Sequence, residues 1–271
     1  MKPDFTNPKV MGVLNITPNS FSDGGAYIET LDAIKHAEAM ITQGAAIIDI
    51  GGESTRPGSD PISFKEELRR VMPVIEELVP RFPDILFSID TTKFEVAKTA
   101  LESGVHLVND VSGLQADSRL ADLCGVYDAT LIIMHSQGKP KTMQHKPEYK
   151  NVVDDVSAFF ARQIKLARDR GCKNIILDPG IGFGKTLKHN LELLANLRKL
   201  NQFGLPIMVG ASRKASIGQI LNDRPVEGRL AGTLAVHYDA LTKGCKIIRV
   251  HDVQEAFDII LIYNAIYSLN N

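Results

Sequence analysis

Short apolar runs alternate with longer segments of helical periodicity along the whole chain. The segment Thr30–Gln43 has its apolar residues three and four positions apart, which predicts an amphipathic helix. The apolar run Ala45–Ile50 that follows is too short for a helix and predicts a buried strand. The same alternation continues along the chain and predicts eight strands, at residues 9–15, 45–50, 85–89, 105–108, 129–134, 175–178, 206–210 and 246–250.

Glycine follows most of the predicted helices directly. The helices are predicted at residues 30–43, 64–79, 91–103, 118–124, 152–170, 188–200, 211–243 (in more than one piece) and 253–267. Glycine is the residue that most easily ends a helix, and five positions fit this role: Gly44, Gly104, Gly125, Gly171 and Gly244. Pro73 lies inside the second predicted helix and is expected to kink or divide it.

Strands that alternate with helices predict a parallel α/β fold. Eight such units in 271 residues predict one domain, residues 1–271, folded as a (β/α)8 TIM barrel. Long polar segments predict that the loops after the first, second and fifth strands are extended. A doubly wound open sheet is the alternative, but it usually carries a phosphate-binding fingerprint after its first strand, and this chain has none.

The composition excludes partners that are held by bulk electrostatics. A net charge of −1 argues against nucleic acid and membrane surfaces as partners. The chain has no apolar run of about 18 residues, as a membrane span needs, and its first ten residues lack the apolar core of a signal peptide. Cys124, Cys172 and Cys245 show no CxxC spacing, so we expect reduced packing residues in a cytoplasmic protein.

Polar residues end almost every predicted strand. They are Asn15, Asp49, Asp90, Asn109, His135, Asp178 and Arg249, with Lys214 in the loop after the seventh strand. In a barrel all these strand ends open onto one face, where the active site is built. Polar groups gathered at the end of a buried barrel need partners, and a bound ligand would provide them. The sequence therefore predicts a ligand site at that face, with Asp178 as its strongest candidate.

Three loop motifs carry candidate chemistry. The segment Gly180–Thr186 is like a phosphate-binding loop, but Pro179 stands where that motif requires glycine. Residues 54–58, Ser-Thr-Arg-Pro-Gly, fit either a plain surface turn or a loop that binds an anion and closes over it. Residues 212–214, Ser-Arg-Lys, place two cations at the start of a helix and favour an anionic or electron-rich ligand.

The last strand and the first strand add possible phosphate contacts. Arg249 and His251 alternate, so in an extended chain their side chains point the same way, either into solvent or toward an anion. The chain has no HExxH motif and no cysteine–histidine cluster, so zinc is not expected. Asn15 together with phosphate oxygens could hold Mg²⁺, which commonly keeps few protein ligands.

Seven segments together resemble the bacterial dihydropteroate synthases, in the same order and along nearly the whole chain. They are MGVLNITPNSFSDGG (11–25), DIGGESTRPG (49–58), SIDT (88–91), VNDVSG (108–113), LDPGIGFGK (177–185), GASRK (210–214) and RVHDV (249–253). The resemblance implies a transferase of folate biosynthesis. It would join 4-aminobenzoate to 6-hydroxymethyl-7,8-dihydropterin diphosphate by an SN1-like substitution, giving dihydropteroate and pyrophosphate. It further implies a homodimer and a sulfonamide target.

The resemblance also implies roles for individual residues. The pterin diphosphate would be bound by Thr55, Asp90, Asn109, Asp178, Lys214, Arg249 and His251. The 4-aminobenzoate pocket would be formed by Phe21, Thr55, Arg56, Pro57, Gly182, Phe183 and Lys214. Catalysis falls to Asp90, Lys214, Arg249 and His251, and Asn15 would hold Mg²⁺ on the diphosphate.

Two other functions stay open at this point. A methyltetrahydrofolate-binding methyltransferase domain would share the acids that bind the pterin, but we expect it to lack the motifs at residues 54–58 and 212–214. A non-catalytic pterin-binding subunit should have degenerate loops, whereas all the expected site residues are present here. Ala215 stands where the synthases often have serine or arginine, which leaves the contact to the aminobenzoate carboxylate unassigned.

Overall fold

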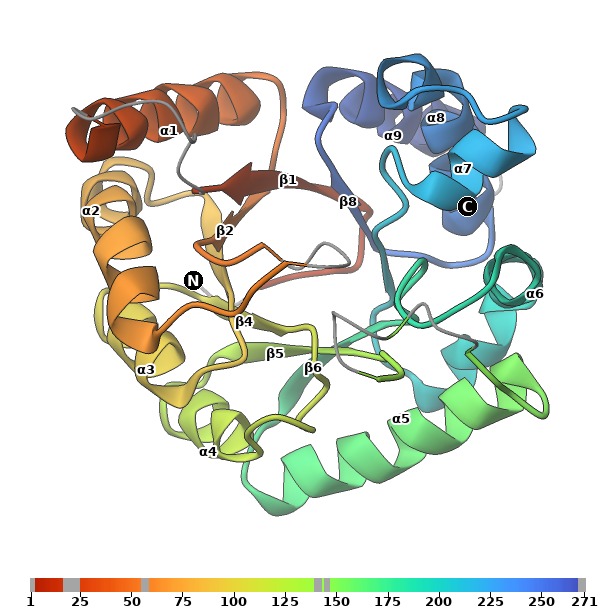
Figure 1. Ribbon diagram of the computed structural model, residues 1–271, viewed down its shortest axis with the longest axis horizontal. Coiled ribbons are helices and arrows are strands. Elements are labelled where there is room, and N and C mark those ends of the chain that lie inside the picture. The colour runs from red at the N-terminus through yellow and green to blue at the C-terminus, as the bar shows by residue number, and fades with distance from the viewer. Residues whose placement is uncertain (1–2, 17–24, 55–58, 139–142, 144–146, 268–271) are drawn as a thin grey trace.

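Eight parallel strands lie around a common axis, and helices surround them in the computed structural model (Figure 1). The structure describes residues 3–16, 25–54, 59–138, 143 and 147–267. The strands are β1 (Lys9–Asn15), β2 (Ile47–Gly51), β3 (Leu86–Asp90), β4 (Leu107–Asp110), β5 (Thr130–Met134), β6 (Asn174–Asp178), β7 (Met208–Val209) and β8 (Ile247–Val250). This arrangement confirms the predicted TIM barrel.

The helices follow the strands in regular alternation. They are α1 (Gly25–Thr42), α2 (Phe64–Arg81), α3 (Phe94–Glu102), α4 (Arg119–Val126), α5 (Val152–Asp169), α6 (Leu187–Ala195), α7 (Ala215–Ile220), α8 (Leu230–Thr242) and α9 (Val253–Tyr267). Two short 3₁₀ helices, η1 (Leu197–Phe203) and η2 (Val226–Arg229), complete the described elements. The segments between β1 and α1, β2 and α2, and β5 and α5 are long, as predicted, and each lies partly outside the described residues.

Hydrogen bonds join neighbouring strands around almost the whole barrel. The strand order is β6-β5-β4-β3-β2-β1-β8-β7. The gap between β6 and β7 is bridged by the N–H of Leu177, which donates to the carbonyl of Pro206 at 2.9 Å. The pairing at this seam is a single bridge between Leu177 and Ile207.

Two predictions for the helices differ from the structure. Pro73 does not divide the second helix, because α2 is one helix from Phe64 to Arg81. Gly125 does not end the fourth helix, which continues to Val126. A Cβ at Gly125 would lie 2.9 Å from the carbonyl carbon of Gly171, so this glycine permits close backbone packing. The other four predicted helix-ending glycines do adopt positive φ angles, from 88° to 102°.

One apolar side chain from each strand closes the interior of the barrel. The eight are Met11, Ile47, Leu86, Leu107, Ile132, Ile176, Met208 and Ile247, and all are buried. Successive side chains of a strand point to opposite sides, so residues two positions further along also face the barrel interior. This apolar ring therefore forms a floor, and the residues two and four positions after its members lie between it and the carboxyl-terminal mouth.

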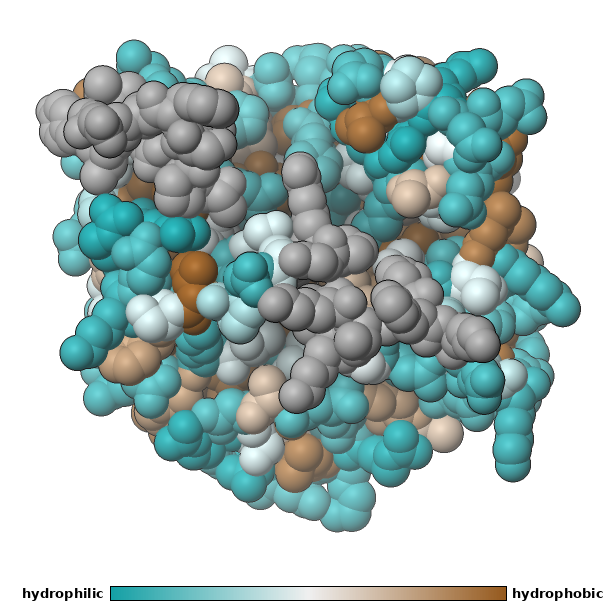
Figure 2. Space-filling model, in the orientation of Figure 1, coloured by the Kyte–Doolittle hydropathy of each residue, from teal (hydrophilic) through white to brown (hydrophobic). Residues whose placement is uncertain are grey.

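The surface adds little to this picture. Outside the grey residues, the face shown in Figure 2 is mainly hydrophilic, and its hydrophobic residues are scattered. Among the helices that the structure describes, none is both long and apolar enough to span a bilayer.

The ends of β5 and β6 approach so closely that a side chain at Gly180 has no room. Gly180 has a φ of 66°, and a Cβ there would lie 2.0 Å from the carbonyl oxygen of His135. We expect Gly180→Ala to destabilise the fold by about 3 kcal/mol or more, because left-handed strain adds to a backbone clash. Urea unfolding would measure the change in the free energy of unfolding.

Gly204 provides the matched control for this substitution. Its φ of 63° is nearly the same, but no described atom lies within 4 Å of a Cβ built there. Gly204→Ala should therefore cost only the backbone strain, about 1–2 kcal/mol. Equal losses for the two variants would show that the close approach to His135 is not a constraint.

Candidate active site

A polar layer lies directly above the apolar ring. Asp49, Asn109 and Arg249 each follow a ring residue by two positions, on β2, β4 and β8. Their side chains meet across the barrel, because the amide nitrogen of Asn109 and Nε of Arg249 both donate to Oδ2 of Asp49, at 2.9 and 2.6 Å. The alternation of strand side chains thus converts three separate sequence positions into one cluster.

Arg249 is the central charge of this layer. Its Nη2 donates to Oδ2 of Asp90 at 2.8 Å, so one guanidinium bridges two carboxylates that lie on β2 and β3. Burial opposes the charge on Arg249, but Asp49 and Asp90 outweigh it and raise the pKa of the guanidinium. Burial raises the pKa of Asp90, Arg249 opposes this rise, and the carboxylate of Asp49 adds to it.

Two oxygen atoms of the polar layer lack a partner among the described residues. They are Oδ1 of Asp49 and Oδ1 of Asn109, and both are buried. A buried acceptor without a hydrogen bond costs free energy, so a donor from water or a ligand is expected there. The layer can therefore accept hydrogen bonds from a molecule that carries several N–H groups.

Asp178 ends β6 beside this layer and is 5% exposed. Its Oδ1 accepts a hydrogen bond from the N–H of Gly180 at 2.7 Å. Among the described residues this is the only hydrogen bond of the Asp178 carboxylate. Burial raises the pKa of Asp178, while the N–H of Gly180 and the cations Lys214, Arg249 and Lys185 oppose the rise. The second carboxylate oxygen is thus available to a ligand donor.

Lys214 faces Asp178 from the loop after β7. Its ammonium group donates to the carbonyl of Ile181 and lies 4.1 Å from the centre of the Phe183 ring, within cation–π range. Burial lowers the pKa of Lys214 to about 8, with Asp178 opposing and Arg249 adding to the shift. The backbone and ring of the β6–α6 loop therefore position this amine.

The neighbouring cation Arg213 does not join the site. It has a φ of 54°, and its guanidinium forms a two-pronged ion pair with Asp252, with Nε 2.9 Å from Oδ2. The sequence predicted that two cations at this helix start would face the ligand. In the structure Arg213 pairs with Asp252, and only Lys214 of the two contacts the β6–α6 loop. The N–H of Arg213 also donates to Thr233 at 3.0 Å, which helps to hold the left-handed backbone.

Two further predicted residues lie at the rim. His251 is exposed, and its Nδ1 lies 3.0 Å from the hydroxyl oxygen of Ser212, which also accepts the N–H of His251 at 3.2 Å. When this hydroxyl donates to Nδ1, Nε2 carries the ring proton and can donate to another group. Asn15 is also exposed, and its Oδ1 lies 3.7 Å from the position of a Cβ built on Gly51.

The structure brings together most of the residues predicted from the sequence. Asp90, Asn109, Asp178, Gly182, Phe183, Lys214 and Arg249 converge on one mouth, with Asn15 and His251 at its edge. Four predicted residues lie outside the described part of the chain: Phe21, Thr55, Arg56 and Pro57. Their roles stay predictions.

Sequence reasoning gave no individual role to two residues that the structure makes central. Asp49 appears in the sequence only as one polar strand residue, but its position two after inward-facing Ile47 was the signal that it faces the barrel interior. Lys185 belongs to a glycine loop whose phosphate-binding reading fails, and no sequence pattern shows that this lysine is 3% exposed.

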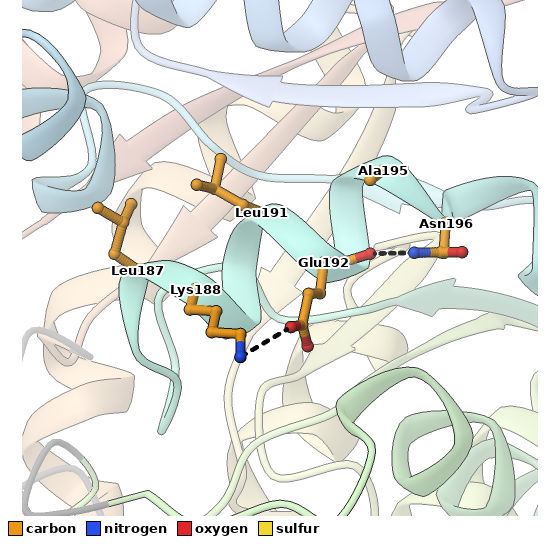
Figure 3. A pocket seen from close by; sticks show the side chains of 6 residues that line it. All are labelled: Leu187, Lys188, Leu191, Glu192, Ala195 and Asn196. Atoms are coloured by element: carbon orange, nitrogen blue, oxygen red, sulfur yellow. Dashed lines mark hydrogen bonds and ion pairs between the residues drawn. The ribbon is translucent and has the colours of Figure 1, made fainter.

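Within the described part of the chain, neither a cluster of metal-binding side chains nor the depression on the outside of α6 resembles the polar site in the barrel mouth. Among the described residues no group of three or more His, Cys, Asp or Glu could hold a metal ion by itself. A shallow depression follows α6 and is lined by Leu187, Lys188, Leu191, Glu192, Ala195 and Asn196 (Figure 3). It has one exposed ion pair, between Lys188 and Glu192 at 3.7 Å, and lies on a single outer helix away from the polar layer.

Comparison with known proteins places the chain in a family. The profile of the pterin binding enzyme family matches residues 11–251. The chain is 46% identical over 267 residues to the dihydropteroate synthase of Escherichia coli (strain K12), covering 98% of this chain and 94% of that protein.

Solved structures of dihydropteroate synthases are similar to this chain in both sequence and fold. A Yersinia pestis dihydropteroate synthase in a sulfonamide drug complex is 44% identical, with a TM-score of 0.92 over 99% of this chain and 97% of that one. A Xanthomonas albilineans dihydropteroate synthase with 4-aminobenzoic acid is 38% identical, with a TM-score of 0.90 over 97% of this chain and 94% of that one. The chain therefore belongs to the pterin-binding enzyme family.

Proposed function

We propose that this chain is a transferase that joins 4-aminobenzoate to 6-hydroxymethyl-7,8-dihydropterin diphosphate, giving 7,8-dihydropteroate and pyrophosphate in folate biosynthesis. The observation that carries the proposal is the buried carboxylate of Asp178, which has one oxygen left for a ligand and stands beside Lys214 and the Asn109–Asp49–Arg249 cluster. Its relatives across nearly its whole length are dihydropteroate synthases, which favours this reaction over that of a methyltransferase domain.

The polar layer suits the hydrogen-bonding edges of a pterin. The amino-pyrimidine edge carries adjacent N–H donors, and a carboxylate can accept two such bonds side by side. Asp178 takes this role in the proposal, and Asn109 and Asp90 bind other edges of the ring. The unpartnered oxygens of Asp49 and Asn109 would also find donors there.

The diphosphate is assigned to the rim of the mouth. Arg249 binds carboxylates through one N–H each of Nε and Nη2, and its other N–H groups are proposed to bind the diphosphate. His251, and Thr55 outside the described residues, would bind the remaining oxygens. These donors would stabilise the negative charge that develops on the leaving diphosphate.

Mg²⁺ fits this rim as a partner of the substrate. Asn15 offers an exposed amide oxygen there, and the described residues hold no set of three acids or histidines that could bind the ion alone. Such a donor set suits Mg²⁺, which takes oxygen ligands and usually keeps water and phosphate among them. When bound, the ion would supply charge neutralisation for the diphosphate.

The substitution requires no protein nucleophile. The diphosphate departs from a CH2 group on an electron-rich ring, so positive charge develops on the pterin, and the carboxylates of Asp90 and Asp178 stabilise it. The amino group of 4-aminobenzoate then attacks this carbon and releases a proton. Gly182, Phe183 and Lys214 form one wall of the pocket for this second substrate. Phe21, Thr55, Arg56 and Pro57 are proposed to complete it.

Three further properties are part of the proposal: a homodimer, a cytoplasmic location and inhibition by sulfonamides. Exposed apolar side chains on α6, α7 and α9, among them Leu191, Ile220 and Ile262, favour a homodimer. The three cysteines are buried and unpaired, which favours the reducing cytoplasm. A sulfonamide, as an analogue of 4-aminobenzoate, is proposed to compete for the same pocket.

The reaction itself is the direct test of the proposal. Purified protein given both substrates and Mg²⁺ should release pyrophosphate and form dihydropteroate in equal amounts, measured by a coupled pyrophosphate assay and by chromatography. Omission of 4-aminobenzoate is the control and should abolish dihydropteroate. A folded protein that binds the pterin but forms no product would support a non-catalytic pterin-binding subunit instead.

The role of Asp178 predicts a large loss of pterin affinity in a variant of nearly the same shape. Asp178→Asn removes the charge and replaces one of the two acceptor oxygens by an NH2 donor, so it should weaken pterin binding by about 2–5 kcal/mol. Isothermal titration calorimetry would measure the affinity, and Asp169→Asn, on the exposed end of α5, is the control. An affinity within about twofold of the unmodified protein would rule out a paired carboxylate contact.

The buried acids predict a pH dependence of pterin binding. Burial raises the pKa values of Asp90 and Asp178 above the usual aspartate value, and the ionised forms are the ones that accept from the pterin. Affinity should therefore be present above the raised pKa values and be lost as the pH falls through them. The usual pKa of an aspartate is about 4. Calorimetry with a neutral pterin should show that the affinity already falls at pH values well above this. Constant affinity down to that pH would contradict the assignment.

A further inference from the structure

The loop between β6 and α6 is held through several of its backbone groups. The N–H of Gly182 donates to Oδ1 of Asn190 at 2.8 Å, and the N–H of Phe183 donates to the carbonyl of Gly180 at 3.1 Å. The carbonyl of Gly184 accepts from the hydroxyl of Tyr149 at 2.8 Å. Asn190 comes from α6 and Tyr149 from the segment before α5, so the loop is fixed from two sides.

Lys185 holds the same loop from inside. Its ammonium group contacts the carbonyl oxygens of Gly180, His135 and Phe183 at 2.9, 3.1 and 3.1 Å, and Nδ1 of His135 at 2.9 Å. Burial and the Lys185 charge lower the pKa of His135 to about 3, so its ring is neutral and Nδ1 can accept. Lys185 is 3% exposed.

Burying the Lys185 ammonium group without a carboxylate partner costs free energy. A buried ammonium group normally pairs with a carboxylate, whereas among the described residues Lys185 contacts three carbonyls and one ring nitrogen. Burial lowers the pKa of Lys185 to about 7, with Asp178 opposing this shift and Lys214 adding to it. The contacts instead join the end of β5 to both ends of the loop.

The loop in turn positions the groups that face the second substrate. The Ile181 carbonyl accepts from Lys214, and the Phe183 ring lies under the Lys214 ammonium group. A Cβ at Gly182 would lie 2.9 Å from Cδ of Lys214, so the loop backbone packs directly against the stem of this lysine. A shift of the loop would therefore move the ring and the amine together.

We propose that Lys185 is a positioning residue that fixes the Gly180–Gly184 loop, and through it Phe183 and Lys214, for the binding of 4-aminobenzoate. Tyr149 supports the same loop from outside with one hydrogen bond. The assignment of the second substrate rests on the proposed function, whereas the fixing of the loop does not. Lys185 touches no substrate and acts through the loop.

The kinetic test compares two lysines of the same segment. Lys185→Met keeps the length of the side chain but removes the donors, and Lys188→Met is the control because that side chain is 83% exposed. We expect Lys185→Met to raise the KM for 4-aminobenzoate about tenfold or more. The KM for the pterin diphosphate should change much less, and Lys188→Met should change neither.

A purely structural role gives a different result. A variant that is only less stable lowers apparent kcat through the loss of folded enzyme and leaves both KM values unchanged. That outcome, with a lower melting temperature, would overturn the proposal. An equal rise in both KM values would overturn it as well, because the loop would then not act on the aminobenzoate side.

Two further measurements test the fixing of the loop if Lys185→Met folds poorly or the unmodified protein is inactive. Tyr149→Phe removes only the hydroxyl that holds Gly184, and it should raise the KM for 4-aminobenzoate about threefold. Tyr127→Phe, which removes an exposed contact to Glu102, is its control.

Hydrogen exchange of residues 180–185 without substrates tests the loop alone. Exchange should be faster in Lys185→Met and in Tyr149→Phe than in their controls. Unchanged exchange would refute the fixing of the loop, whereas an inactive parent with faster exchange in the variants would refute the proposed function alone.

Discussion

A buried guanidinium between two carboxylates is the interaction on which the mouth of this barrel depends. Arg249 joins β8 to Asp49 on β2 and Asp90 on β3, and Asn109 on β4 binds the same oxygen of Asp49. Removing one member would leave a charge buried without its partner, which costs far more than the pair contributes. These contacts cross-link four strands just above the apolar ring, so the geometry of the ligand site and the integrity of the barrel share the same atoms.

The order of the elements could be read from the sequence because it depends on local patterns. Apolar runs of strand length and helical spacing repeat through the chain, and both are visible without knowledge of contacts. Boundaries were less accurate where a distant segment decides them. Gly125 lies inside a helix, where the backbone of Gly171 approaches it closely, and β7 covers only Met208–Val209 of the predicted strand at residues 206–210.

The candidate site divides in the same way. Strand-end residues such as Asp90, Asn109 and Asp178 were predictable, because a parallel barrel gathers its strand ends at one face. Which cation pairs with which acid was not predictable. Arg213 forms an ion pair with Asp252, 39 positions away. Lys185 donates to carbonyls of two loops. Such choices depend on tertiary distances, which no spacing in the sequence reports.

The apolar ring at the base of the barrel gives the site a closed end. Water can hydrate Asp49, Asn109 and Arg249 only from the mouth, because eight packed side chains separate them from the opposite face. A ligand that fills the mouth therefore also dries the layer beneath it. The local dielectric constant then falls, and each contact between the guanidinium and its carboxylates becomes stronger at the moment when charge must be stabilised.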